Sequence, residues 1–442
     1  MAQIGLFWFN NDLRIADNAA LLKASVQVDK LLCVVCVPPA TNSLDASRPA
    51  NLSANRLGFL RDSLIELDNN LKGQGQHLLV RYESGLQAIP QLITQYNISQ
   101  IYSSGETGYF ENNQWQVLDK RYAMIGFHQI SGNRLFEADG LPFAPAETPE
   151  SFSKFRRLVE HLPTLAVAPS PERLPPSPAP VENWLGQFPD CQSRENLLFA
   201  GGETSGFNHL QNYFGRGLAS TYKQTRNGLD GMDYSTKFSP WLANGCLSPR
   251  QIMAELTSYE QNIERNDSTY WIYFELLWRE YYQWYAEKHG AKLFAFAGIK
   301  KSRPTTSFYA ERFKKWCTGT TPYPIVNACI KQLNQTGYMS NRGRQLVASC
   351  FVHELGLDWR YGAGYMEEQL VDYDVASNWG NWQYLAGVGA DPRGHRRFDL
   401  QKQTDIYDPS GEFIQRWQGD ADLAGHLIPL DSADAADWPI SN

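Results

Sequence analysis

Residues 372–384 contain the densest group of side chains in this chain that could do chemistry. The segment reads Asp-Tyr-Asp-Val-Ala-Ser-Asn-Trp-Gly-Asn-Trp-Gln-Tyr. Asp372 and Asp374 are too close in sequence to share a helical face, so we expect irregular backbone or a helix start there. One interpretation is a solvated loop with aromatic anchors. The other is a pocket for a redox cofactor, in which amides and carboxylates hydrogen-bond a polar ring and tryptophan carries electrons.

A second group precedes an apolar helical run that has Pro240 near its start. The group consists of Ser235, Thr236, Lys237 and Ser239. Hydroxyls and free N–H groups at a helix N-terminus form a site that suits an anion such as phosphate. For an isolated segment, an ordinary serine or threonine helix cap is the default interpretation.

A third group lies on the helix predicted over residues 270–284. Trp271, Glu275, Trp278 and Arg279 have the spacing of one helical face. An aromatic stripe is usually core, but buried charges need partners. The mixed face therefore favours a polar ligand with a flat hydrophobic surface.

Two further polar clusters follow. Asn341 and Gln345 are one turn apart at a predicted helix start and can point at one object, while Arg344 points in a neighbouring direction. Residues 391–397, Asp-Pro-Arg-Gly-His-Arg-Arg, form with Lys402 the clearest basic cluster. A solvated charged loop is the usual explanation, and a phosphate-contact patch is the alternative.

Composition bounds the class of protein. The chain has 442 residues, enough for two or three domains, and a net charge of −7, which excludes a general positive field for duplex DNA. The seven cysteines suggest no disulfide framework, and Cys33 and Cys36 fall on opposite faces of a predicted strand, so we expect no metal site there. We see no signal peptide and no apolar run near the ~20 residues of a membrane span. A soluble, cytoplasmic protein without a membrane partner is expected.

The first 130 or so residues alternate short apolar runs with helical patterns, which predicts an α/β domain with a parallel, doubly wound sheet. The predicted strands are residues 4–9, 31–37, 77–82, 100–103 and 127–130. The predicted helices between them are residues 17–24 with Asp17 as N-cap, 55–71, 86–96 and 112–123. No Gly-x-Gly-x-x-Gly follows the first strand, so NAD binding is not predicted.

The rest of the chain divides by composition. Eight of the 24 prolines fall in residues 162–189, which therefore cannot form a helix or a central strand. From residue 201 to about 417 the pattern is helical. We expect an α/β domain at 1–131, a connector at 132–200, an all-α domain at 201–425 and a short tail at 426–442.

Several long motifs, in order, resemble the photolyase/cryptochrome flavoprotein family, and most closely its cryptochrome DASH branch. They are Phe-Trp-Phe-Asn-Asn-Asp-Leu-Arg-Ile-Ala-Asp-Asn (7–18), Leu-Ala-Ser-Thr-Tyr-Lys-Gln-Thr-Arg-Asn-Gly (218–228), Ser-Thr-Lys-Phe-Ser-Pro-Trp-Leu-Ala (235–243), the stretches 336–349 and 370–389, and Tyr-Asp-Pro (407–409). The resemblance implies an N-terminal antenna domain and a helical domain that holds FAD.

The resemblance also implies roles for single residues. The pyrophosphate side of FAD would contact Tyr222, Ser235, Thr236, Lys237, Phe238 and Ser239. The remaining cofactor positions would be Trp271, Glu275, Arg279, Asn341, Arg344, Asp372, Asp374 and Asn378. Asn378 matches the position that faces flavin N5, and Arg344 with Asp372 matches the pair beside it. Trp382 and Trp359 match the inner two members of an electron-hopping chain, whose outer tryptophan is missing from residues 303–308; Trp316 or Tyr309 is a candidate substitute.

The substrate implied by the resemblance is a cyclobutane pyrimidine dimer in single-stranded or looped DNA. The lesion pocket would be lined by Glu275, Trp278, Asn341, Gln345 and Tyr384. Asn341 and Gln345 cannot transfer protons as the histidines of (6-4) photolyases do, so (6-4) repair is not expected. Glu106 matches a position that contacts a methenyltetrahydrofolate antenna. The alternative function is a blue-light photoreceptor with little or no repair, and the protein is expected to be a monomer.

Overall fold

The amino-terminal part folds around a parallel sheet, as the strand–helix alternation predicts. The computed structural model describes residues 2–38, 52–300, 303–390 and 396–421. The strands are β1 (Ile4–Phe9), β2 (Lys30–Cys36), β3 (Leu78–Arg81), β4 (Gln100–Ser104) and β5 (Gly126–Ile130). They lie in the order β3-β2-β1-β4-β5, and each neighbouring pair is parallel. Each strand end falls within one residue of its prediction.

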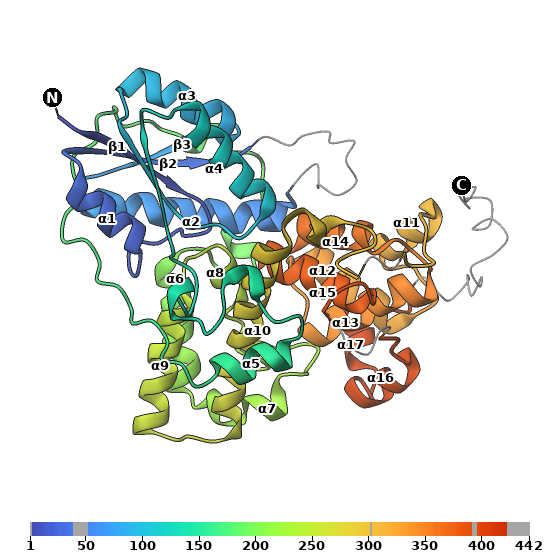
Figure 1. Ribbon diagram of the computed structural model, residues 1–442. Helices are drawn as coiled ribbons and strands as arrows, with labels where there is room; N and C mark the ends of the chain where they lie inside the picture. Colours follow the sequence, from blue (N-terminus) through green and yellow to red (C-terminus); the bar gives the residue numbers. More distant parts are fainter. Residues whose placement is uncertain (1, 39–51, 301–302, 391–395, 422–442) are drawn as a thin grey trace.

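Helices cover both faces of this sheet, which confirms the doubly wound prediction. In Figure 1, α1 and α2 lie on one side of the strands, and α3 and α4 lie on the other. The bounds are α1 (Ala19–Gln27), α2 (Ala54–Gly73), α3 (Gly85–Tyr96) and α4 (Tyr109–Arg121). Alternate residues of β1 enter different cores: Phe7 packs with the α1–α2 side and Trp8 with the α3–α4 side. Cys33 and Cys36 are separated in the same way, as predicted.

The predicted N-cap of the first helix is wrong. Asn18 caps α1, and its side chain accepts the Leu21 N–H at 3.0 Å. Asp17 instead has a left-handed φ of +53°, and its carboxylate accepts from Arg250 Nε at 2.8 Å. A tertiary partner far along the chain therefore overrides the local capping preference of aspartate.

The connector packs against the sheet domain along its proline-rich part. The Leu31 N–H donates to Pro176 O at 3.2 Å, and the Tyr82 hydroxyl donates to Trp184 O at 2.7 Å. Before this part, α5 (Phe152–Val159) buries Phe152, Phe155 and Val159 and leaves Lys154 and Arg157 exposed. Short 3₁₀ turns complete the connector: η1 (Ala138–Gly140), η2 (Pro145–Glu147), η3 (Leu185–Gln187) and η4 (Arg194–Asn196).

The remainder is helical, as predicted, and is organised around the long helix α10. This helix packs against α15, α7, α9 and α5, and Figure 1 shows α6 to α10 below the sheet with α11 to α17 extending to the right. Its start is capped by Asn266, which accepts from Ser268 and Thr269 N–H groups. Within the described residues, none of the helices has both the length and the apolar composition needed to cross a bilayer. The elements are α6 (Glu203–Gly215), η5 (Leu218–Thr221), α7 (Tyr222–Thr225), α8 (Ser239–Ala243), α9 (Pro249–Asn262), α10 (Asp267–His289), η6 (Gly290–Phe294), α11 (Ala310–Thr318), α12 (Pro324–Thr336), α13 (Asn341–Ser349), the π-helical turn η7 (Cys350–Glu354), α14 (Trp359–Gln369), α15 (Val375–Leu385), α16 (Leu400–Tyr407) and α17 (Glu412–Arg416).

Candidate functional site

The loop before α8 buries a positive charge in a strained turn. Ser235 and Lys237 both have left-handed backbone, with φ of +64° and +54°. Residues with a side chain adopt this conformation at a cost, which is typical of functional segments. Lys237 is 5 % exposed, and its Nζ lies 4.8 Å from the ring centre of Tyr338. Within the described ranges no carboxylate pairs with this ammonium. A buried cation in that state favours a bound anion such as a phosphate group.

The hydroxyls of this loop do not cap the helix that follows. The N-cap of α8 is Phe238, and no side chain makes a capping hydrogen bond. The ordinary-cap interpretation is therefore wrong here, and within the described residues the Ser235, Thr236 and Ser239 hydroxyls have no hydrogen-bond partner, which leaves them available for a ligand. Nearby, Tyr222 opens α7 and is buried, and burial raises the pKa of its phenol well above the usual value.

An ion pair between the half-buried Arg344 and the buried Asp372 lies near Tyr338. Arg344 Nη2 donates to both Asp372 oxygens, at 2.9 and 2.7 Å, and its Nε donates to Met339 O at 2.9 Å. The Arg344 guanidinium is 5.5 Å from the Tyr338 ring centre. Because Lys237 contacts the same ring, the loop before α8 and the Arg344–Asp372 pair border one region. The predicted proximity of Arg344 and Asp372 is confirmed.

Residues of α15 continue from this ion pair. Asp374 caps the helix by accepting the Ser377 N–H at 2.7 Å, which confirms a helix start in the segment 372–384. Asn378, one turn later, donates from Nδ2 to Ala363 O at 3.0 Å. Because that bond uses the amide N–H, the Oδ1 atom is left as an acceptor. An acceptor at this position suits the N–H of a reduced flavin ring.

Glu275 of α10 forms an ion pair with Arg226. The same guanidinium lies 4.4 Å from the ring centre of Trp271, so the Trp271–Glu275 face holds a cation between an aromatic ring and a carboxylate. Burial raises the pKa of Glu275, and Arg226 acts in the opposite direction. The sequence prediction did not assign Arg226 to the site, although it lies inside the motif at residues 218–228.

Trp278 is packed more closely than a free stacking surface would be. The Phe152 ring of α5 lies parallel to it, with centroids 3.8 Å apart at 13°. Tyr384 approaches Trp278 edge-on at 6.2 Å, which confirms that these two predicted pocket residues are neighbours. On Tyr384 lies the Arg396 guanidinium, 4.6 Å from its ring centre.

The start of α13 carries two further predicted residues. Asn341 is exposed and Gln345 is half-buried on the same helix. Between them in sequence, Arg342 Nη2 donates to Asn227 Oδ1 at 3.3 Å, next to Arg226. Arg342 was missed, although its position beside Asn341 was a signal. Thus the start of α13 contacts the segment that follows α7, and α7 itself packs on α10.

The basic cluster is only partly visible, because residues 391–395 lie outside the described ranges. Arg397 pairs with Glu354 at 2.8 Å. The backbone N–H of Lys402 donates to the side chain of Asp399, the N-cap of α16. Arg396 alone, of the described members, lies at the predicted lesion pocket, over Tyr384. The phosphate-contact hypothesis stays a prediction.

The two predicted electron carriers are buried on adjacent helices. Trp382 is 2 % exposed and packs on Gly362 of α14, where a Cβ would approach its ring to 2.3 Å. Trp359 opens α14 and donates its indole N–H to Phe296 O at 3.0 Å. Its ring packs against Trp379, with centroids 5.7 Å apart.

A pocket of about 330 Å³ lies between the sheet domain and the helical half. Glu106 accepts from the Asn11 side chain at 2.9 Å; burial, then the charge of Glu111, raises the pKa of Glu106 to about 8. Arg279 lines this pocket and donates to Asn133 O at 2.8 Å. The Arg279 guanidinium is therefore engaged at this pocket, whereas Arg226 pairs with Glu275. The further lining includes Arg56, Thr107, Phe110, Gln114, Gln283, Phe294, Glu367, Tyr373 and Asp374.

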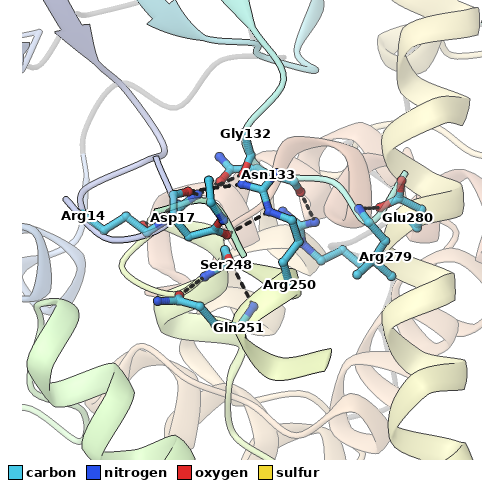
Figure 2. A network of polar contacts seen from close by, with 12 residues as sticks. Arg14, Asp17, Gly132, Asn133, Ser248, Arg250, Gln251, Arg279 and Glu280 are labelled. Atoms are coloured by element: carbon cyan, nitrogen blue, oxygen red, sulfur yellow. Dashed lines mark hydrogen bonds and ion pairs between the residues drawn. The ribbon is translucent and has the colours of Figure 1, made fainter. Parts of the chain in front are cut away.

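The seam beside this pocket is a buried polar network, shown in Figure 2. Arg14 donates to Asn133 Oδ1 at 2.9 Å and to Gly132 O at 2.9 Å. Arg250 donates to the Asp17 carboxylate at 2.8 Å and also to Gly132 O at 2.9 Å. We define these five residues as the seam. Its hydrogen bonds connect the loop after β1, the connector and α9. They thereby hold the walls of the pocket in place.

FAD fits the site built by Lys237, Arg344 and α15. The buried Lys237 ammonium and the loop hydroxyls, which have no protein partner among the described residues, suit its pyrophosphate, and the Asn378 amide suits its ring. In the described part of the chain, no three His, Cys, Asp or Glu side chains are gathered as a metal ion would require.

Comparison with known proteins agrees with this geometry. The family described as DNA photolyase matches residues 5–179, and the FAD binding domain of DNA photolyase matches residues 271–422. Cryptochrome DASH of Idiomarina loihiensis is 52 % identical over 438 residues, covering 99 % of this chain and 97 % of the relative. Cryptochrome DASH of Vibrio parahaemolyticus is 52 % identical over 440 residues, covering 99 % and 98 %. A crystal structure of a Synechocystis sp. cryptochrome is 38 % identical, with a TM-score of 0.88, and covers 98 % of this chain and 92 % of that one.

Proposed function

Because the chain belongs to the photolyase and cryptochrome family, within its cryptochrome DASH branch, we propose that it repairs cyclobutane pyrimidine dimers with light, preferentially in single-stranded DNA. The observation that carries the proposal is the buried Lys237, whose charge has no carboxylate partner among the described residues. It supports FAD bound across Lys237, the Arg344–Asp372 pair and Asn378. When bound, FAD supplies the light-driven electron transfer that splits the dimer.

The chain's own residues would position both partners of the reaction. Arg226 fixes the Glu275 carboxylate, which would accept from a pyrimidine edge. Trp278 and Tyr384 would contact the bases, and Asn341 with Gln345 would complete the pocket. Asn378 offers its Oδ1 as an acceptor while Ala363 holds its N–H group.

Single-stranded DNA is the favoured substrate for two physical reasons. The net charge of −7 gives little long-range attraction to duplex phosphates. In addition, a dimer must leave the base stack to reach a pocket, and that cost is smallest in a single strand. Arg396 over Tyr384 supplies local positive charge where the flipped bases would enter.

The interdomain pocket supports a second chromophore, and methenyltetrahydrofolate is our proposal for it. Glu106 with its raised pKa would carry a proton near neutral pH and could donate it in a hydrogen bond to a pterin ring. Phe110 and Phe294 add flat apolar surface, and Arg279 adds a cation for glutamate carboxylates. The absorbance of the purified protein, and chromatography of its extracted chromophores, test this assignment.

One observation favours the photoreceptor as a second candidate. Phe152 covers one face of Trp278 at 3.8 Å, so that face is not open to a pyrimidine ring. A protein that keeps this stack closed would retain FAD and its light response without repairing DNA.

Light-dependent repair of dimer-containing oligonucleotides separates the candidates. We would compare matched single- and double-stranded substrates, using protein with measured FAD content that has been chemically reduced. We expect repair in light, none in darkness, and faster repair of single strands. Glu275→Gln should lose about tenfold to a hundredfold, since a hydrogen bond to a charged group is worth roughly 1.5–3 kcal/mol. Full FAD content without repair of either substrate would contradict the enzyme and favour the photoreceptor.

A further inference from the structure

Trp382 has an aromatic neighbour that leads away from Trp359. Its ring lies 6.3 Å from that of Trp316 on α11, at 72°. Phe351 contacts both rings, at 5.5 and 4.7 Å. The Trp316 ring lies 5.5 Å from that of Tyr365 on α14. Three oxidisable side chains therefore follow one another ring against ring, from α15 through α11 to α14.

The far end of this row reaches the surface at a group that can lose a proton. The half-buried Tyr365 hydroxyl lies 2.6 Å from Oδ1 of Asn334, which is exposed, and 3.0 Å from Cys317 O. By contrast, the Trp316 indole is 0 % exposed and donates to the carbonyl of Val347 at 3.2 Å. Because the fully buried Trp316 indole has no contact with solvent, an oxidised Trp316 would keep its proton and take an electron from Tyr365. An oxidised phenol is strongly acidic and would release its proton to water.

The predicted outer position beside Trp359 carries no indole within the described residues 303–308. Ser307 pairs with Leu357 in an isolated bridge, and its carbonyl accepts the Asp358 N–H at 2.8 Å. The segment 303–308 therefore does lie next to Trp359, but it carries Thr305 and Thr306 where an indole was expected. Hydroxyl side chains of this kind do not supply electrons.

We propose that Tyr365 and Trp316 form an electron-supply branch to Trp382. The inference rests on the proposed function, in which photoexcited FAD draws one electron from Trp382. Trp316 gives one electron to the oxidised Trp382, and Tyr365 gives one electron to Trp316. The Tyr365 phenolic proton passes to water, leaving a neutral tyrosyl radical. An external thiol returns a hydrogen atom to that radical, and two thiyl radicals join as a disulfide.

The test uses the full chain with oxidised FAD, in light, with dithiothreitol as the thiol. Tyr365→Phe keeps the ring and removes the hydroxyl. Its matched control is Tyr361→Phe, one turn earlier on α14, where the ring stacks on Phe308 at 4.3 Å. Electron paramagnetic resonance of samples frozen under light should show a tyrosyl radical in the wild type and in Tyr361→Phe. The signal should be lost in Tyr365→Phe.

Two further measurements separate electron supply from packing. Flavin photoreduction should slow in heavy water for the wild type and Tyr361→Phe, but this isotope dependence should vanish in Tyr365→Phe, because the proton-releasing step is gone. Trp316→Phe should also lose the tyrosyl signal, although Tyr365 is still present. Unchanged FAD content in each variant serves as the folding control.

The branch is overturned if Tyr365→Phe keeps the tyrosyl radical, or if the wild type photoreduces its flavin without one. Absence of any flavin photoreduction in the wild type overturns it as well. Dimer repair by protein reduced beforehand with dithionite does not need the branch, so Tyr365→Phe should repair normally in that assay. Failure of repair in the wild type would count against the proposed function and leave the radical result standing.

Discussion

The seam and the loop before α8 both bury positive charge, but they differ in whether the protein supplies partners for that charge. At the seam, Arg14 and Arg250 are 0 % and 4 % exposed and are surrounded by the Asp17 carboxylate and backbone carbonyls. At the loop, Lys237 is equally buried and faces the Tyr338 ring, without a carboxylate in the described ranges. Burial alone therefore does not mark a binding site. The supply of protein acceptors separates a structural charge from one that waits for a ligand.

The largest expected effect comes from disrupting the seam, whose charges are paired within the protein. Asp17→Asn leaves Arg250 without its anion while keeping the side-chain shape. Removing one partner of a buried pair costs roughly 3–5 kcal/mol, so the free energy of unfolding should fall by about that amount. Urea denaturation followed by circular dichroism measures it. The control is Asp267→Asn, whose pair with Lys223 is exposed and should be worth about 0–1 kcal/mol. Equal effects of the two substitutions would contradict the structural role of the seam.

A substitution in the loop before α8 should affect stability and ligand binding in the reverse sense. Lys237→Met removes a buried charge that has no anion partner among the described residues, so the stability of the apoprotein should stay the same or rise. FAD affinity should fall by about tenfold to a hundredfold, corresponding to roughly 1.5–3 kcal/mol for a hydrogen bond to a charged group. Titration of the apoprotein with FAD, followed by flavin fluorescence, measures it. Lys223→Met is the exposed control. A destabilised apoprotein with normal FAD affinity would show that Lys237 is structural.

An uncharged side chain of the predicted lesion pocket, Trp278, extends the comparison. Trp278→Ala should weaken binding of dimer-containing single strands by roughly 1–3 kcal/mol, the worth of one stacked base. The FAD content should be retained, because Trp278 packs on Phe152 and Tyr384 rather than on the Lys237 loop. Fluorescence anisotropy with a labelled oligonucleotide gives the affinity. Loss of FAD, or unfolding, would identify Trp278 as core; unchanged lesion affinity would favour the photoreceptor.

The last prediction concerns the pH dependence of stability, through the Glu106 carboxyl. Burial raises the pKa of Glu106 from 4.5 to about 8, so the folded protein holds a proton that the unfolded chain releases. Stability should then fall as pH rises through this window. Glu106→Gln cannot ionise and should remove that fall: its melting temperature should match the wild type near pH 4.5 and exceed it increasingly toward pH 8. A constant difference across the range would contradict the assignment.

The strands were predictable because each is decided by its own residues. A run such as Ile4–Phe9 is apolar on both faces, and helical patterns on either side fix its limits. Asp17 shows where local reasoning stops. Its type suits a helix cap, but its partner Arg250 is 233 residues away, and no pattern around residue 17 contains that information.

The candidate site divides in the same way. The Arg344–Asp372 pair was predicted through the resemblance, and the short spacing of Asp372 and Asp374 predicted irregular backbone or a helix start, which the structure places at Asp374. The Arg226–Glu275 pair and the Phe152–Trp278 stack join distant segments, so side-chain type alone could not reveal them. Spacing also grouped Arg279 with Trp271, but tertiary packing turned it toward Asn133.

The seam also bears on how the chain acquires its structure during synthesis. Arg14 reaches Gly245 O, 231 residues along the chain. The first domain is complete in sequence long before these partners leave the ribosome, yet domains usually fold in the order in which they emerge. We therefore expect nascent chains that end shortly before residue 245 to be cleaved readily by protease near residues 14–17, and chains that extend past residue 250 to resist. In this view the sheet forms early in translation, but the loop after β1 becomes fixed only when residues 245–250 have been synthesised.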